Sequence, residues 1–364
     1  MCLNKFSRCF LLVLIFLSEL YCVNWPRWWP KMPQKYGGAP NAFYQFAFTP
    51  RETAMGRTGI ASCEGQFAPY WNPAGLAHDN KPNNTIGAGL ISRYTPESWY
   101  SGLPYCGISY HPYFFIGSIC CQPKDWKFAF GLNTVGLLVV DLIETSLSPS
   151  DEIIMGGNFE TYEILVMPTV AYRSGDFAAG LNYKMIYRDY TKVDNYLTSG
   201  YFFAGLDFGF LTELSGKVVP KVFEQTNFGG VIKLDRDHRN QQVKIGVGVS
   251  AMTPMRNFCR AKLNCDLTGG NYTSLFSDFG IGVEGIIKPT ELLNLLPSKT
   301  LTNLELFLRG GITLKGFGTV GIGLFICNIM RLDFSWEQNL WGHNDYFGLT
   351  NSPLKGSLCG QYSW

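Results

Sequence analysis

The sequence predicts an all-β protein, a transmembrane antiparallel β-barrel of about 14 strands. Charged residues make up only 16% of the 364 residues, against about 25% in average soluble domains. Aromatic residues reach 15%, and there are 40 glycines. From Thr85 onward, segment after segment alternates with a period of two, as strands with two different faces do. No segment after the N-terminus offers about 18 uninterrupted apolar residues, so strands must do any spanning.

The N-terminus has the pattern of an export signal. Lys5 and Arg8 form a positive region, and the apolar run from Cys9 to Leu17 is too short to cross a bilayer comfortably. We expect cleavage near residues 18–24. A lipidated Cys22 and an uncleaved anchor helix stay open as alternatives.

The strand pattern is clearest in residues 243–251, where Val247 belongs to an apolar face and Ser250 to a polar one. Such segments run to about 9–13 residues, the length of a tilted membrane strand, whereas globular strands usually have about five or six. The polar face is often Gly, Ser or Ala rather than long charged residues, which favours a barrel in lipid over a soluble sandwich. The same alternation recurs in residues 126–135, 177–188, 201–210, 279–287, 302–314, 317–326 and 330–337.

Longer breaks in the alternation predict loops at 145–160, 211–225, 253–274 and 288–301, the last with a short helix between Pro289 and Pro297. Cys259 and Cys265 lie six residues apart in one of these breaks and could close a loop disulfide in an oxidising compartment. The C-terminal segment, 353–364, lacks strict alternation, so the position of the last strand stays open. Its final residue, Trp364, is the aromatic ending expected of an outer-membrane barrel.

Residues 41–83 differ from the rest, because they lack strand alternation and are rich in small residues. The lumen of a barrel of about 14 strands is too wide for its own side chains to fill, so this segment is predicted to lie inside as a hatch. Pro73 lacks an amide donor and restricts Asn72 to extended backbone. Asn72 can then bridge backbone groups that a coil in a lumen leaves unpaired, and Asn72, Pro73 and Ala74 are the predicted hatch motif.

The segment from Ala54 to Ala77 (AMGRTGIASCEGQFAPYWNPAGLA) resembles the N-terminal signature of FadL-type long-chain fatty acid transporters and their PorV-like relatives. Gly205 to Gly209, Asn227 to Gly230 and Leu308 to Gly311 resemble later strands of that family. The overall sequence pattern most resembles that of an uncharacterised spirochaete branch of the family. The resemblance implies a 14-stranded barrel with a luminal hatch and a hydrophobic ligand that leaves sideways through the wall. Arg57 departs from the pattern, since a small residue is usual there.

No catalytic, cofactor-binding or metal-binding motif occurs, so we expect neither an enzyme nor a cofactor nor a metal site. The net charge of +2 without a basic block speaks against nucleic acid. Basic side chains on the predicted luminal face are candidate contacts for a ligand headgroup, although most should pair with acidic neighbours. These candidates are Lys184, Arg188, Lys244, Arg309 and Arg331.

Together these features predict a signal peptide at 1–23, an N-terminal segment with the luminal hatch at 24–83 and an outer-membrane barrel at 84–364. The expected function is binding and transport of hydrophobic small molecules, long-chain fatty acids first, with outer-membrane lipid around the barrel. The alternative is a barrel without transport: a PorV-like accessory for protein secretion, or a structural or adhesive surface protein.

Overall fold

The computed structural model describes residues 49–78, 84–97, 107–121, 127–147, 153–191, 201–214, 222–236, 241–256, 258–270, 278–289, 304–327, 329–339 and 354–363. The predicted signal peptide and the N-terminal residues up to position 48 lie outside this description. Between residues 49 and 78, three short helices precede the first strand: α3 (Pro50–Ala54) and the 3-10 turns η1 (Ala68–Tyr70) and η2 (Pro73–Leu76). Within the described residues, no helix is both long and apolar enough to cross a membrane.

The strands that follow fill the rest of the described chain. They are β1 (Thr85–Glu97), β2 (Gly107–Cys121), β3 (Phe128–Leu147), β4 (Ile153–Ser174), β5 (Phe177–Thr191), β6 (Tyr201–Glu213), β7 (Gln225–Arg236), β8 (Gln241–Met252), β9 (Cys259–Gly270), β10 (Asp278–Ile287), β11 (Leu304–Thr313), β12 (Phe317–Ile326), β13 (Met330–Asn339) and β14 (Leu354–Ser363).

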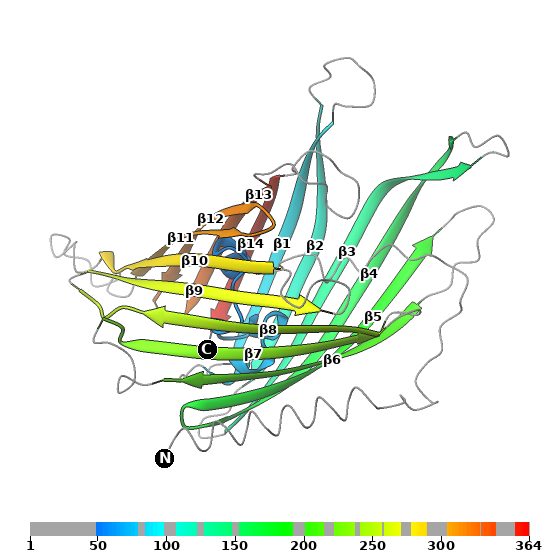
Figure 1. Cartoon of the computed structure of the whole chain (residues 1–364). Helices are drawn as coiled ribbons and strands as arrows, with labels where there is room; N and C mark the ends of the chain where they lie inside the picture. The colour runs from blue at the N-terminus through cyan, green and yellow to red at the C-terminus, as the bar shows by residue number, and fades with distance from the viewer. Residues whose placement is uncertain are drawn as a thin grey trace, which may run out of the picture. The chain divides into compact units, whose positions relative to one another are not determined.

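All of these strands pair antiparallel with their neighbours in sequence, and β1 also pairs with β14, so the sheet closes on itself (Figure 1). Thr85 lies opposite Ser363 and Tyr94 opposite Leu354. The predicted antiparallel barrel is therefore confirmed. The segment at 353–364 supplies the closing strand even though it alternates poorly, because small residues such as Gly356 and Gly360 weaken the contrast between its faces.

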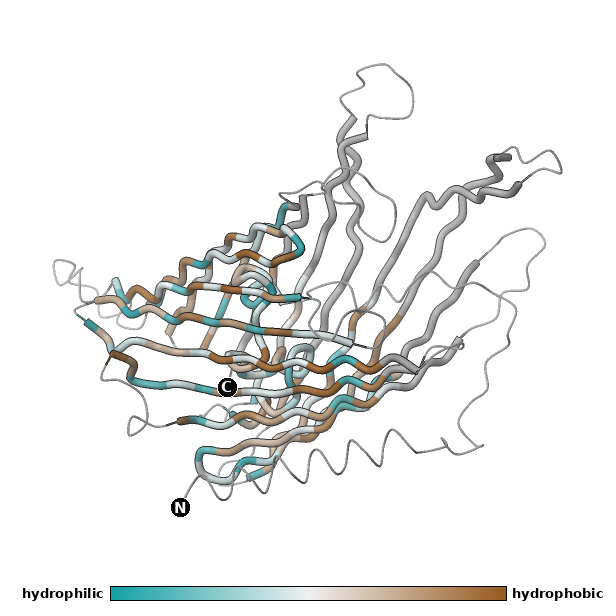
Figure 2. Tube along the Cα trace, in the orientation of Figure 1, coloured by the Kyte–Doolittle hydropathy of each residue, from teal (hydrophilic) through white to brown (hydrophobic). Residues whose placement is uncertain are grey.

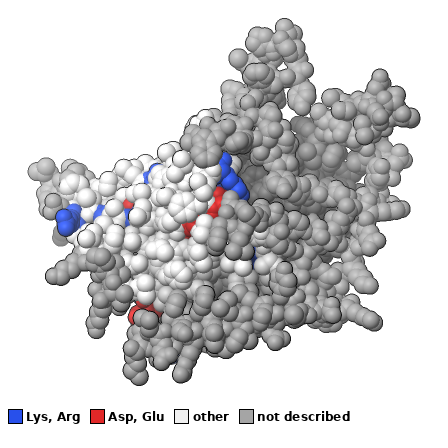
Figure 3. Space-filling view, viewed as in Figure 1, with Lys and Arg blue, Asp and Glu red and all other residues white. Residues whose placement is uncertain are grey.

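The two faces of the wall differ as the alternation predicted, which Figure 2 shows as a change of colour from residue to residue along the strands. In β8, Val247 and Val249 are exposed on the outside, whereas Ser250 is buried on the inside. Most of the described surface in the view of Figure 3 carries no charge. An apolar outer face and a polar inner face are what a barrel in lipid requires, since charge on the outer face is costly.

Two of the predicted loops are wrong, and the first is the break at 145–160. β3 continues to Leu147 and β4 begins at Ile153. The ladder between these strands shifts register between Val139 and Leu142 and again between Ile143 and Thr145. A β-bulge adds an unpaired residue to one strand, so a strand with bulges can continue without a strict period of two.

The second wrong loop is 253–274, which contains β9. Its inner face carries the polar residues Lys262, Asn264 and Asp266, so the stretch reads as polar in sequence. The suggested Cys259–Cys265 disulfide is also wrong, because both cysteines are free and stand in this one extended strand. Six residues of strand span roughly 20 Å, and a disulfide needs Cα atoms within about 7 Å. The helix expected between Pro289 and Pro297 lies outside the described residues beyond Pro289.

Candidate functional site

Residues 49–78, here called the inner segment, lie against the inner face of the barrel wall (Figure 1). Its polar backbone groups bond partly to one another in short turns, such as Cys63 N to Gly59 O, and partly to side chains of the wall. Its first half, 49–66, bonds to β9–β13, and its second half, 67–78, bonds to β3–β7. The two halves are joined through Trp71, whose indole Nε1 donates to Thr49 Oγ1 over 2.5 Å.

Asn72 is the centre of the second half and is fully buried. Its backbone is extended, with φ −151° and ψ 115°, as expected for a residue before proline. The amide Nδ2 donates to the carbonyl oxygen of Ile60 at 2.8 Å and to that of Phe210 in the wall at 3.0 Å. The amide Oδ1 accepts from Ala74 N at 3.1 Å and so caps η2. One side chain thus joins both halves of the inner segment to β6.

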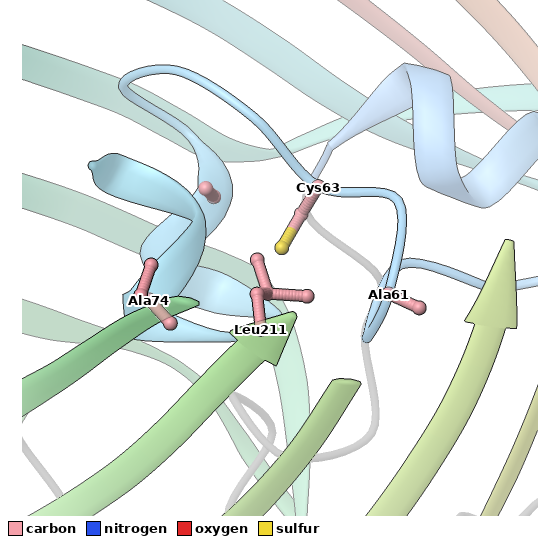
Figure 4. Close-up of a cluster of buried hydrophobic side chains, with 6 residues drawn as sticks. Ala61, Cys63, Ala74 and Leu211 are labelled. Atoms are coloured by element: carbon pink, nitrogen blue, oxygen red, sulfur yellow. The ribbon is translucent and has the colours of Figure 1, made fainter. Parts of the chain in front are cut away.

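Pro73 and Ala74 complete the predicted motif by packing on wall glycines. Pro73 is the first residue of η2, where a missing N–H costs nothing. A Cβ built on Gly180 of β5 would lie 2.4 Å from the carbonyl carbon of Pro73, so only glycine allows this approach. Behind this contact a small apolar cluster fills the space between segment and wall (Figure 4). It contains Ala61, Cys63, Ala68, Ala74, Ala178 and Leu211.

Other wall side chains donate to backbone carbonyl groups of the second half. Asn182 Nδ2 donates to Pro69 O at 2.7 Å, and Lys233 Nζ donates to Tyr70 O at 2.7 Å. Arg173 donates to the carbonyl of His78. The acceptors in these bonds are uncharged carbonyl oxygens, so the wall holds the second half without ion pairs to it.

Ion pairs dominate the first half. Arg51 Nη2 lies 3.2 Å from Glu284 of β10, and Arg309 of β11 approaches the same carboxylate to 2.6 Å. Arg309 also binds Asp333 of β13 at 2.7 Å, so a chain of charges runs from the segment into the wall. The network balances four basic against four acidic side chains, which are buried or partly buried except for the exposed Glu64: Arg51, Lys262, Arg309 and Arg331 against Glu52, Glu64, Glu284 and Asp333.

Asp266 anchors the same half through backbone amides, because its Oδ2 accepts from Gly59 N at 2.6 Å and from Ile60 N at 2.8 Å. Two backbone amides donating to one carboxyl oxygen fix residues 59 and 60 to β9. Thr319 of β12 adds a third anchor, accepting from Gly56 N at 2.9 Å.

Arg57, which departs from the family pattern, has a structural explanation. Its φ is 58°, in the left-handed region that favours glycine. Two bonds of 2.7 Å to the carboxylate of Glu337 and the ring of Phe317, 4.1 Å below the guanidinium, hold the side chain. A bidentate ion pair with ring stacking offsets the backbone strain that a non-glycine residue meets there.

Several groups of the inner segment have shifted pKa values, among them Glu64, His78 and Cys63. Burial opposes ionisation of Glu64, but Arg51, Lys262 and Arg331 outweigh it and lower its pKa to about 2. Burial and the charge of Arg173 lower the pKa of His78 to about 4, so His78 is neutral at pH 7. Burial raises the pKa of the Cys63 thiol well above its usual value, and its Sγ donates to Asn72 O. Cys63 therefore packs as an inert small group.

The residues predicted to contact a ligand headgroup differ in burial and in their ion-pair partners. Lys184 is buried and lies 2.6 Å from Asp207 of β6, and Arg309 is committed to Glu284 and Asp333. Arg331 is partly exposed, with its Nε 2.7 Å from Asp333. Lys244 lies on the luminal side of β8, facing Lys233 in the ladder. The side chain of Arg188 lies outside the described residues.

The sequence did not predict the ion pairs between the inner segment and the wall. Arg51, Glu52 and Glu64 lie in a stretch without periodicity, and nothing in their spacing connects them to strands more than 200 residues away. The signal that was available is their position: charged residues in an otherwise small and apolar luminal segment need partners when buried.

Comparison with known proteins finds the fold. No family model and no curated protein sequence matches the chain. The toluene transporter TbuX of Ralstonia pickettii aligns with a TM-score of 0.52 at 14% identity, covering 87% of this chain and 98% of that one. The Pseudomonas putida toluene transporter TodX gives 0.50 at 9% identity, covering 86% and 96%. A mutant of the monoaromatic hydrocarbon channel TodX gives a TM-score of 0.54 at 10% identity, covering 87% of this chain and 98% of that one. The chain therefore has the fold of FadL-type transporters, which confirms the family resemblance of the sequence at the level of the fold.

Proposed function

We propose that this protein is exported to the outer membrane, loses residues 1–23 on the way, and transports hydrophobic small molecules. The ligand class we favour is long-chain fatty acids. Its structural neighbours, toluene transporters and a monoaromatic hydrocarbon channel, support the broader class of hydrophobic compounds. The inner segment, within the region 24–83, acts in this proposal as a hatch.

One observation carries the proposal: residues 49–78 lie against the inner face of the wall, and their described contacts with it are all non-covalent. Hydrogen bonds, ion pairs and glycine contacts hold residues 49–78 in place. Such contacts can open on the microsecond-to-second timescales of gating motions. A purely structural barrel needs no such removable segment.

A route through the wall is also supported by the β4–β5 ladder. Pro168 stands in the interior of β4 and cannot donate to a neighbouring strand. Paired residues run from Glu160 to Val166 and resume at Thr169, so the pairing is interrupted at the level of the hatch motif, next to Asn182. We propose this interruption as the place where a ligand leaves sideways.

The direct test of the hatch is deletion of residues 41–83. We expect the barrel to fold, since the strands close without this segment, and its conductance in planar bilayers to rise, because water then fills the lumen. The control is a heat-modifiability gel that verifies folding. Unchanged conductance in the folded deletion variant would place the segment outside the conducting path and refute the gating role.

Ligand class is tested by binding a chain-length series of fatty acids to the purified protein. Burial of each methylene contributes about 0.8 kcal/mol, so affinity should climb roughly fourfold per carbon and depend little on salt. A flat series would contradict transport of hydrophobic molecules. Tight binding of a secreted protein without lipid would instead support the PorV-like alternative.

A further inference from the structure

Strands β3 and β4 are much longer than the other strands of the wall. They have 20 and 22 residues, whereas each strand from β10 to β14 has 10. A tilted strand needs only about 9 to 11 residues to cross a membrane. β5 ends at Thr191, opposite Glu160 of β4, and the β2–β3 ladder reaches only to Leu137. The excess length of β3 and β4 therefore projects from the end of the barrel opposite Thr85 and Ser363 (Figure 1).

The projecting part is a two-stranded ribbon made of residues 138–147 and 153–159. Its two strands pair with each other as far as Leu147 and Ile153. In the part of the chain that the structure describes, no other strand pairs with residues 153–159 on the side away from β3. Such an edge presents a row of backbone N–H and C=O groups. Since a two-stranded ribbon is only marginally stable in water, a third strand would stabilise it.

The sequence of this edge does little to prevent a further strand from adding. Natural edge strands usually carry lysine, other charged residues or proline for that purpose. Residues 153–159 (IIMGGNF) contain no charged residue and no proline. The feature that limits the edge is a register shift at Gly156 and Gly157, because a bulge twists the strand. The edge is thus open to pairing over a short stretch.

The ribbon and its base are acidic. Residues 138–147 and 153–163 contain four acidic residues and no Lys, Arg or His, although the whole chain has 30 Lys and Arg against 28 Asp and Glu. Carboxylates are costly in lipid, so this composition fits a ribbon that stands in water. It favours a partner strand with basic residues and opposes a second copy of this chain, whose ribbon has the same charge. The four residues are Asp141, Glu144, Glu160 and Glu163.

From the open backbone edge and the acidic composition together, we propose that residues 153–159 are a docking site for an extended segment of a partner protein. Basic and apolar residues alternate in that segment, and it adds to the ribbon as a third strand, antiparallel to β4. Backbone hydrogen bonds supply the affinity, and attraction between basic and acidic side chains supplies the specificity. The proposal does not depend on what the lumen transports.

The experiment measures binding of short fluorescent peptides to the full-length protein in a non-ionic detergent. One peptide alternates lysine with valine, and a second alternates glutamate with valine. A third alternates lysine with proline, which keeps the positive charge but cannot extend a sheet. We expect the lysine–valine peptide to bind about tenfold more tightly than the other two, because it alone offers both backbone pairing and opposite charge. On binding, it should slow amide hydrogen exchange at residues 153–159 and leave exchange in β13 unchanged.

A shortened variant, in which an Asn-Gly turn replaces residues 140–160, tests the location. Val139 and Thr161 face each other in the β3–β4 ladder, so a two-residue turn can close the hairpin there. This variant should fold, as judged by a heat-modifiability gel, and lose its preference for the lysine–valine peptide. Glu160→Gln should weaken binding of that peptide about two- to fivefold, the effect of one exposed ion pair. Asp176→Asn, in an exposed turn at the other end of the barrel, should not change it.

Several results would overturn the proposal. Equal binding of the lysine–proline peptide would reduce the site to charge attraction, and equal affinities of Glu160→Gln and Asp176→Asn would remove the basic partner. Undiminished binding to the shortened variant, or slowed exchange at residues 138–147 in place of 153–159, would put the site elsewhere. Self-association of the protein through the ribbon would assign the edge to a second copy. If the shortened variant fails to assemble, the peptide comparison on wild type still decides, and binding of none of the peptides refutes the site.

Discussion

The two halves of the inner segment are fixed to the same barrel by different chemistry. Residues 49–66 use buried ion pairs such as Arg51–Glu284, and residues 67–78 use carbonyl hydrogen bonds and close packing on glycine. The interaction energy of an ion pair changes when another charged group comes close to it. The hydrogen bonds of a buried amide such as that of Asn72 are lost only when the side chain leaves its site. The comparison teaches that the position of the first half depends mainly on charge and that of the second half mainly on hydrogen bonding and packing.

Proteases report on the two halves separately. Trypsin can cut after Arg57 in the first half, and chymotrypsin after Trp71 in the second, once either bond leaves the lumen. Residues 67–78 contain no Lys or Arg, so the tryptic signal belongs to the first half alone.

Removal of one charge from the buried network should have the largest effect. Glu284→Gln leaves Arg51 and Arg309 without a shared carboxylate, and breaking a buried ion pair costs about 3 to 5 kcal/mol. We expect tryptic cleavage after Arg57 to accelerate strongly while Trp71 stays protected from chymotrypsin. The exposed outer residue Gln338 provides the control as Gln338→Ala, which should change neither rate. Equal loss of protection at both sites would show that the halves are one unit.

Asn72→Ala should have the next largest effect. The substitution leaves the carbonyl groups of Ile60 and Phe210 unpaired and removes the cap of η2, together about 2 to 4 kcal/mol. Because Asn72 contacts Ile60, we expect both protease sites to open and bilayer conductance to rise. If both sites stay protected from protease as in wild type, Asn72 does not hold the two halves of the inner segment to the wall.

Gly180→Ala should loosen the second half by overpacking. The added Cβ meets the backbone of Pro73 at 2.4 Å, so the segment must shift, at about 1 to 3 kcal/mol. The matched control is Gly136→Ala in β3, where a Cβ meets nothing within 4 Å. We expect chymotrypsin to cut faster at Trp71 in Gly180→Ala but not in Gly136→Ala. Equal cleavage rates in the two variants would contradict the close contact between Gly180 and Pro73.

The smallest expected effect is a pH dependence from His78, which faces Arg173, Glu64 and Lys262. Its pKa is about 4 in the docked segment against a usual 6.5, so the undocked form binds more protons between these values. Docking is therefore fully stable above pH 6.5 and weakens as the pH falls toward 4, by about 1 kcal/mol at pH 5 after allowance for partial exposure. The difference in chymotryptic rate between wild type and His78→Gln across pH 5 to 7 measures this. If the difference in rate between the two proteins stays constant over this pH range, the pH dependence arises from a group other than His78.

The sequence by itself determined the barrel and the orientation of its wall residues. Val247 and Ser250 were placed on their correct faces because a strand in lipid must alternate apolar with polar side chains. The motif of Asn72, Pro73 and Ala74 could be singled out because proline and a short amide side chain act locally on backbone geometry. β9 and the continuation of β3 were missed, because polar luminal residues and register shifts hide the period of two.

Only the tertiary structure decided which charges meet. Arg51 and Glu284 are 233 residues apart, and Arg57 and Glu337 are 280 apart, so closure of the barrel alone brings each pair together. The structure also gave Arg57, unusual for its position in the family pattern, a carboxylate partner that offsets its left-handed backbone. Alternation is a local consequence of strand geometry and can be read along the chain. Ion pairing in a lumen depends on the register of every intervening strand, and no local pattern encodes that.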